Sequence, residues 1–165
     1  MIRWFQYAAF CPLLRMHGHR EPHVGAGAGH SGGPNELWSY GDEAYAVMRS
    51  YLGLRTRLTP YLLEQMDHAS ATGVPPMRPL FLEFPDDPAA WAVEDQFLLG
   101  PDILVAPVTE LGARQRRVYL PAGAEWTDSE TGRRYPGGAH VVIDAPLDRI
   151  PLLVRDDARL PLSAG

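Results

Sequence analysis

The sequence lacks the features that mark several classes of protein. Its 165 residues contain one cysteine, Cys11, so no internal disulfide can form, and the apolar residues around it predict a buried thiol. Fifteen basic residues against twenty acidic ones give a net charge of −5, which is not the basic footprint of a nucleic-acid-binding protein. No apolar run approaches the roughly 18 residues of a transmembrane helix. We therefore expect no nucleic-acid partner and no membrane association.

Signatures of common cofactor sites and nucleophiles are also missing. The glycine-rich residues 25–33, GAGAGHSGG, have neither the Lys-Ser/Thr of a phosphate-binding loop nor the GxGxxG spacing of a dinucleotide site, so they predict a surface loop. No Gly-x-Ser-x-Gly motif is present. The sequence therefore predicts no cofactor. The N-terminus has no signal-peptide layout, and with a single cysteine this favours a cytoplasmic location.

What the sequence does contain is a globular composition, with 45% hydrophobic residues, and one long helical pattern. Ser39 or Asp42 is a plausible cap at its start, and Gly73 is expected to end it. Pro60 lies inside the pattern and predicts a kink or two abutting helices. The apolar stripe consists of Ala44, Met48, Tyr51, Leu52, Leu54, Leu58, Tyr61, Leu62 and Met66.

Two apolar runs flank this helix in the sequence. Residues 3–10 predict the end of a helix, and residues 11–16, CPLLRM, predict a buried strand after it. Residues 77–84, MRPLFLEF, predict a second strand, followed by a tight acidic turn in which Asp87 caps a short helix that begins at Pro88. The order of helix, strand, turn and helix is typical of an α/β fold with a parallel strand.

The pattern changes near residue 99. Short β-type runs separated by glycine and proline turns predict an antiparallel sandwich or sheet. The runs are residues 103–108, 116–120, 125–127, 141–143, 152–155 and 160–162. We therefore divide the chain into residues 1–98 and residues 99–165. Two parallel strands cannot bury both faces of a sheet or satisfy its edges. Residues 1–98 therefore look like a piece of a larger unit.

Candidate catalytic groups are few. Acid–base hydrolysis needs two carboxylates at a controlled separation. The candidate pairs are adjacent in sequence and lie where caps or turns explain them: Asp42 with Glu43, Asp86 with Asp87, and Asp156 with Asp157. The structural role is therefore the favoured interpretation of each pair.

Four histidines fall in one irregular stretch, His17, His19, His23 and His30. They could bind a metal, but their spacing matches no common zinc pattern, and solvated loop side chains are the simpler interpretation. His17 differs because it directly follows the apolar run 11–16. At the carboxyl end of a barrel strand it could hydrogen-bond a polar ligand, or the backbone could satisfy it, and both interpretations stay open.

An ordered series of motifs resembles glycoside hydrolase family 31, which includes α-glucosidases and α-xylosidases. The matching motifs are Arg3-Trp4-x-Gln6, Ala9-Phe10-x-Pro12-Leu13-x-Arg15-x-His17-Gly18, Arg55-x-Arg57-Leu58-x-Pro60-Tyr61-Leu62, residues 78–85 (RPLFLEFP), residues 96–108 (QFLLGPDILVAPV), Val118-Tyr119-Leu120-Pro121 and Gly123-x-x-Trp126. The series runs in order over nearly the whole chain.

The resemblance implies a fold and a reaction. Residues 1–98 are expected to form the C-terminal part of a (β/α)8 TIM barrel, with runs 11–16 and 77–84 as its final strands, and residues 99–165 to form the antiparallel β-sandwich that follows it. Family members are retaining hydrolases, in which one aspartate attacks the anomeric carbon and another acts as acid and then base. Both family aspartates lie upstream of the Arg3-Trp4-x-Gln6 motif. The resemblance therefore implies part of an α-glycosidase with no catalytic residue of its own.

The resemblance to the family implies two substrate-binding residues. His17 matches a histidine that hydrogen-bonds the sugar in the −1 subsite, and Arg15 matches a position near the pocket that either touches sugar or supports the strand. The expected partners are an oligosaccharide or glycoside and the missing N-terminal part of the barrel. Residues 19–38 are expected to shape the pocket rim.

Two further interpretations come from other functional classes. The chain could be a non-catalytic module that binds carbohydrate or completes a barrel, with Trp126 and Tyr135 stacking on sugar. It could also be a metal-dependent hydrolase that uses the histidine loop. On any of these interpretations we expect the isolated chain to be marginally stable or prone to aggregation, since a partial barrel exposes a strand edge and helix faces.

Overall fold

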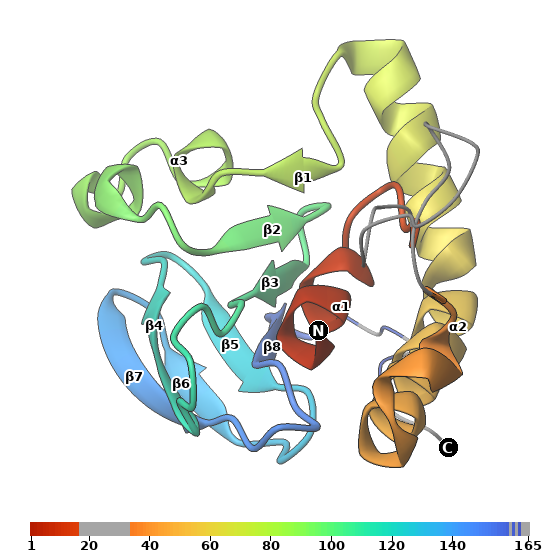
Figure 1. Ribbon diagram of the computed structural model, residues 1–165. Coiled ribbons are helices and arrows are strands. Elements are labelled where there is room, and N and C mark those ends of the chain that lie inside the picture. Colours follow the sequence, from red (N-terminus) through yellow and green to blue (C-terminus); the bar gives the residue numbers. More distant parts are fainter. Residues whose placement is uncertain (17–33, 159, 161, 163–165) are drawn as a thin grey trace.

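The computed structural model describes residues 1–16, 34–158, 160 and 162 (Figure 1). Its helices are α1 (Ile2–Ala8), α2 (Asp42–Thr72) and α3 (Leu80–Glu83), with 3₁₀ helices η1 (Leu37–Tyr40) and η2 (Pro88–Ala92). Its strands are β1 (Met77–Arg78), β2 (Phe97–Leu99), β3 (Ile103–Val105), β4 (Gln115–Leu120), β5 (Glu125–Asp128), β6 (Arg134–Pro136), β7 (Ala139–Asp144) and β8 (Leu152–Arg155). Within this described part, no helix combines the length and hydropathy of a membrane span.

A six-stranded antiparallel sheet in the order β1-β2-β3-β8-β5-β6 forms the middle of the molecule. Helices α1 and α2 lie beside it on one side, and the two-stranded sheet β4-β7 lies on the other (Figure 1). Leu98, Leu104 and Leu153 stand in register and enter the core shared with β4 and β7. Their neighbours Leu99 and Ile103 enter the core shared with the helices. The period of two residues along a strand thus gives one sheet two buried faces.

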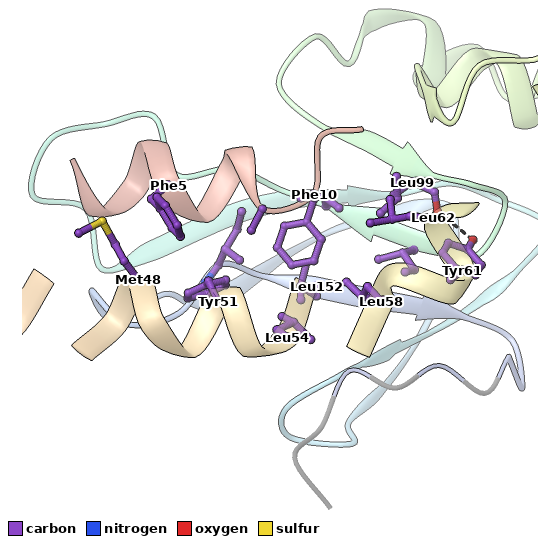
Figure 2. Packing of buried hydrophobic residues seen from close by; sticks show 14 of the residues in the cluster. Phe5, Phe10, Met48, Tyr51, Leu54, Leu58, Tyr61, Leu62, Leu99 and Leu152 are labelled. Atoms are coloured by element: carbon purple, nitrogen blue, oxygen red, sulfur yellow. Dashed lines mark hydrogen bonds between the residues drawn. The ribbon is translucent and has the colours of Figure 1, made fainter. Parts of the chain in front are cut away.

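The helical core is built from large side chains on α1, α2 and the sheet (Figure 2). Phe5 and Phe10 come from α1 and the turn after it, and Met48, Tyr51 and Leu58 come from α2, where they repeat at helical spacing. Phe10 and Tyr51 meet edge to face, with ring centroids 6.4 Å apart. Burial of these side chains, at roughly 1.5–3 kcal/mol each, holds α1 and α2 against the sheet.

Helix α2 is a single element that continues through Pro60, so of the two alternatives the two abutting helices are wrong, and a kink at Pro60 stays a prediction. Gly41 occupies the N-cap position and no side chain caps the helix, so the capping roles expected for Ser39 or Asp42 are wrong as well. The expected C-terminal stop is confirmed, because Gly73 takes the left-handed conformation with φ 79°.

The prediction of one apolar strand at residues 77–84 is wrong. Only Met77 and Arg78 pair, and they pair antiparallel with β2 rather than in a parallel sheet. Pro79 has no N–H to continue a ladder, and its φ of −61° places it as the N-cap of α3 instead. The next expectation is confirmed, since Asp87 caps η2 with a 3.1 Å hydrogen bond from the Ala89 N–H.

The prediction of a buried strand at residues 11–16 is also wrong. No strand is assigned there among the described residues, Pro12 offers no N–H, and the Leu13 side chain is 87% exposed. Cys11 is half-buried rather than buried, and this partial burial raises the pKa of its thiol.

The antiparallel sandwich predicted after residue 99 is confirmed. Five of the six predicted runs contain strands, namely β3, β4, β5, β7 and β8. For the sixth run, Leu160 and Leu162 lie outside any strand. Strands β2 and β6 were not predicted, and β2 spans the proposed boundary between residues 98 and 99. The division of the chain at that boundary stays a prediction.

Candidate functional site

Arg15, one of the two predicted substrate-binding residues, lies in the irregular segment that follows α1. The Arg15 side chain is exposed, while its neighbours Leu14 and Met16 pack against the helical core. His17 lies outside the described residues, as do His19, His23 and His30. The role of Arg15 and His17 in sugar binding stays a prediction.

Arg55 of α2 holds the backbone that leads to this segment. Its guanidinium donates to the carbonyl oxygens of Ala9 at 2.8 Å, Cys11 at 2.6 Å and Pro12 at 2.7 Å. The side chain is half-buried, and burial lowers its pKa. These carbonyls belong to the C-cap residue of α1 and to the turn after it, and Arg55 supplies their donor. It thereby fixes the direction in which the chain leaves α1 towards Arg15.

In the sequence Arg55 belongs to a motif shared with the family, and that motif did not predict this role. The carbonyls that follow α1 can be expected to need hydrogen-bond donors. Nothing in the sequence shows which arginine donates to them.

Arg3 of α1 makes a comparable attachment to the sandwich. Its guanidinium donates to the carbonyl oxygens of Arg149 at 2.6 Å, Ala145 at 2.6 Å and Ala113 at 3.2 Å. Gln6, one turn later, is buried and donates to a carbonyl of the same 145–149 loop at 2.8 Å. The Arg3-x-x-Gln6 part of the first motif therefore has a structural function here.

Tyr51 attaches α2 to the same loop. Its hydroxyl donates to the Asp148 carbonyl at 3.1 Å and accepts from the Ile150 N–H at 3.0 Å. Burial raises the pKa of Tyr51 to about 12, so the hydroxyl keeps its proton at neutral pH. Helices α1 and α2 are thus both hydrogen-bonded to the loop before β8.

The structural interpretation of the candidate carboxylate pairs is confirmed for Asp87, Asp156 and Asp157, whereas Asp42 does not cap its helix. Asp42 and Glu43 lie in the first turn of α2, where negative charge complements the helix dipole. Asp156 accepts from the Glu125 N–H at 2.9 Å, and Asp157 pairs with Arg134 at 3.0 Å. Asp87 accepts from the Tyr119 hydroxyl at 2.7 Å as well as from backbone N–H groups.

The prediction that Trp126 could stack on sugar is wrong. Its side chain is fully buried between the two sheets, with the Phe84 ring centroid 5.9 Å away, and its Nε1–H donates to the Pro121 carbonyl at 3.1 Å. Tyr135 is half-buried, and the Arg133 guanidinium lies 4.9 Å from its ring centroid. Trp126 is instead part of the core between the two sheets.

A metal centre is not supported by the described residues. Among residues 1–16 and 34–158, no group of three or more His, Cys, Asp and Glu side chains could hold a metal ion. The four-histidine cluster of the metal-hydrolase alternative lies outside these ranges.

Two family models match the chain in succession. Residues 1–65 match the TIM-barrel domain of glycosyl hydrolase family 31, and residues 73–159 match the C-terminal domain of that family. The chain belongs to glycosyl hydrolase family 31. The resemblance drawn from its motifs is confirmed, and its fold is the tail of the family 31 TIM barrel followed by a β-sandwich domain.

Other family 31 proteins are similar to nearly the whole chain. It is 37% identical over 161 residues to an α-xylosidase of Saccharolobus solfataricus, covering 98% of this chain and 20% of that protein. The crystal structure of an α-xylosidase from a soil metagenome complexed with xylose is 50% identical, with a TM-score of 0.89 over 95% of this chain and 24% of that one. A Flavobacterium johnsoniae dextranase complexed with glucose is 38% identical, with a TM-score of 0.83 over 96% and 18%.

The chain therefore spans about a fifth of the length of these relatives. Asp87, Asp156 and Asp157 form a cap, a turn contact and an ion pair, and hydrogen bonds from Arg3, Gln6 and Tyr51 hold α1 and α2 to the sandwich. The chain comprises the barrel tail and the following β-sandwich of the family 31 fold, and a role of the segment before residue 17 in sugar binding stays a prediction.

Proposed function

We propose that this chain is the C-terminal part of a retaining α-glycosidase that hydrolyses α-linked xylosides or glucosides. The observation that carries the proposal is the ordered match to the barrel model over residues 1–65 and to the C-terminal model over residues 73–159. The similarity to an α-xylosidase complexed with xylose supports a sugar of this class.

In this proposal His17 and Arg15 contact the sugar, and the nucleophile and the acid/base aspartate belong to the family barrel upstream of the first motif. The chain alone is then inactive. The roles of Asp87, Asp156 and Asp157 in caps and ion pairs support this assignment, since a carboxylate that accepts several backbone or arginine hydrogen bonds is poorly placed for proton transfer.

The test is hydrolysis of an aryl α-xyloside and an aryl α-glucoside by the purified chain, alone and mixed with the upstream barrel of a family 31 α-xylosidase. We expect no turnover by the chain alone and turnover by the mixture. His17→Ala in the mixture is expected to raise KM and lower kcat, because the subsite hydrogen bond holds the bound sugar and becomes stronger in the transition state. The matched control is His68→Ala, an exposed histidine on α2.

Turnover by the chain alone, abolished by His17→Ala, would show that it holds its own acid and nucleophile. The assignment of both groups to an upstream segment would then be wrong. Asp42, Asp86 and Asp87 would be the next residues to change.

A second candidate function is that of a non-catalytic module that completes a barrel supplied by another polypeptide. The observation that favours it is the set of large apolar side chains exposed in the barrel-matching part, namely Trp4, Leu13, Trp38 and Leu63. Such a module forms a stable complex with the upstream barrel whether or not the mixture hydrolyses glycosides, and size-exclusion chromatography of the mixture would detect it.

A further inference from the structure

An open groove of about 760 Å³ lies between α1 and the strands β1 and β2, away from the segment that leads to His17. Its aromatic lining comes from Trp4 and Tyr7 on α1 and from Phe97 on β2. None of residues 11–16 is among its lining residues. The volume is within the range of pockets that hold small organic ligands, roughly 300–1,000 Å³.

The three aromatic rings form a connected wall. The Trp4 and Tyr7 ring centroids are 5.7 Å apart, and Tyr7 meets Phe97 edge to face at 5.9 Å. Tyr7 and Phe97 are half-buried, whereas the Trp4 side chain is 68% exposed. The wall therefore presents a large indole surface to water beside rings that hold their places by packing.

The remaining lining mixes polar and charged residues with the apolar residues Met1, Met77, Pro107 and Val108. Glu94 and Thr109 are exposed, and the Asp95 carboxylate pairs with Arg116 at 2.7 Å. Arg3, which also lines the groove, directs its guanidinium at carbonyls of the sandwich. Glu94 and Thr109 therefore offer acceptor oxygens next to the aromatic wall.

This combination selects a class of ligand. Glu94 disfavours an anion, and a fully apolar partner would bury the Glu94 carboxylate without a hydrogen bond, which is costly. A pyranose ring places apolar C–H groups on an aromatic face and donates its hydroxyl protons to carboxylate oxygens. A neutral saccharide meets both halves of the lining.

We propose that this groove is an accessory saccharide-binding site for an α-linked oligosaccharide, with Trp4 as its stacking platform and Glu94 as its hydroxyl acceptor. The choice of a saccharide rests on the proposed function of the chain, while the location rests on the groove itself. The site is separate from the subsite assigned to Arg15 and His17 and holds sugar units that are not being cleaved.

The test is an NMR titration of the chain with isomaltotriose, observed at the indole N–H signals of its four tryptophans. The Trp4 signal is expected to shift saturably. Trp4→Ala should weaken the affinity about fivefold, the equivalent of roughly 1 kcal/mol for one aromatic contact, and Glu94→Gln should weaken it less. The matched control is Trp91→Ala, which removes an indole that is 59% exposed but lies outside the groove.

The result separates this site from the proposed active site. His17→Ala should leave the Trp4 titration unchanged, so a failure of the proposed function does not remove this binding. Three outcomes overturn the inference: no saturable shift at Trp4, an equal loss with Trp91→Ala, or a shift produced by tetramethylammonium but not by isomaltotriose. A Trp4 signal that becomes insensitive to isomaltotriose when the upstream barrel is added overturns it as well, because the groove is then a polypeptide contact.

Discussion

At the scale of single residues, the buried polar side chains of this chain mostly support backbone segments. Asp87 is the example with the most partners, since its carboxylate caps η2, accepts from the Ala122 N–H at 2.8 Å and accepts from the Tyr119 hydroxyl. Burial opposes ionisation of Asp87, but the hydrogen bonds from Ala122, Tyr119 and Ala89 outweigh it and lower the pKa below its usual value. The same contact helps raise the pKa of Tyr119 to about 12, after burial as the larger cause.

The lowered pKa of Asp87 predicts a pH-dependent contribution to stability. A carboxyl whose pKa is lower in the folded chain stabilises it above the usual pKa, near 3.8, and this contribution is lost as the pH falls through the folded value. Asp87→Asn should therefore lower the free energy of unfolding at pH 7 by about 1–3 kcal/mol, the cost of leaving buried donors poorly satisfied. The gap between the variant and the original chain should narrow below pH 4.

Thermal melts at pH 7 and at about pH 3 measure this gap. Asp86→Asn is the matched control, because the neighbouring side chain is exposed, and it should change the melting temperature little at either pH. An equal gap for Asp87→Asn at both pH values would mean that the charge of the carboxylate contributes nothing.

At the scale of elements, α1 is too short to be stable alone and depends on contacts from α2 and from the sandwich. Its apolar face packs on the helical core, Arg3 and Gln6 bind the 145–149 loop, and Arg55 binds the carbonyls at its end. The segment that leads to Arg15 therefore takes its position from α2 and the sandwich rather than from its own sequence.

This dependence predicts the effect of changing Arg55. Arg55→Met keeps the aliphatic stem but leaves three carbonyls without their donor, and should lower the free energy of unfolding by roughly 2–3 kcal/mol in a urea titration. Arg55→Lys should recover only part of the loss, because an ammonium group cannot reproduce the planar fork of a guanidinium. Arg49→Met, an exposed arginine on the same helix, is the control and should stay within about 0.5 kcal/mol.

Elements with local signals could be predicted from the sequence, and elements that depend on distant partners could not. The start of η2 follows from Asp87-Pro88, and the end of α2 from Gly73. The prediction of a strand over residues 77–84 failed because the apolar pattern continues past Pro79, whereas the strand ends before it. Strand β2 was missed because its three residues form a strand only through their pairing with β1 and β3.

The candidate site likewise has features that local motifs predict and contacts that depend on distant residues. Motifs in the sequence identified the family, which the comparisons confirm, but the attachments made by Arg3, Tyr51 and Arg55 end on backbone carbonyls far along the chain. Carbonyls are common to every residue, so no sequence pattern marks them as targets. The burial of Trp126 and the exposure of Trp4 likewise depend on the packing of the two cores.

At the scale of the whole molecule, one sheet has two covered faces, but the part that matches the barrel presents apolar side chains to water. Trp4, Leu13 and Trp38 are each more than half exposed, and Leu63 is 60% exposed on α2. The sandwich side has its own core centred on Trp126 and depends less on further partners. The expected source of instability is therefore the helical side.

This asymmetry predicts how the isolated chain behaves in solution. We expect strong binding of a hydrophobic dye such as ANS, concentration-dependent association and a broad melt, because contiguous apolar surface promotes association. Trp38→Ser together with Leu63→Ser should reduce dye binding, whereas Leu111→Ser, which changes an exposed leucine in the turn before β4, should not. Addition of the upstream barrel should lower dye binding to the level of the double variant. A monomer with weak dye binding and one sharp cooperative melt would show instead that the helical side needs no further partner, and the barrel-completing function would lose its physical basis.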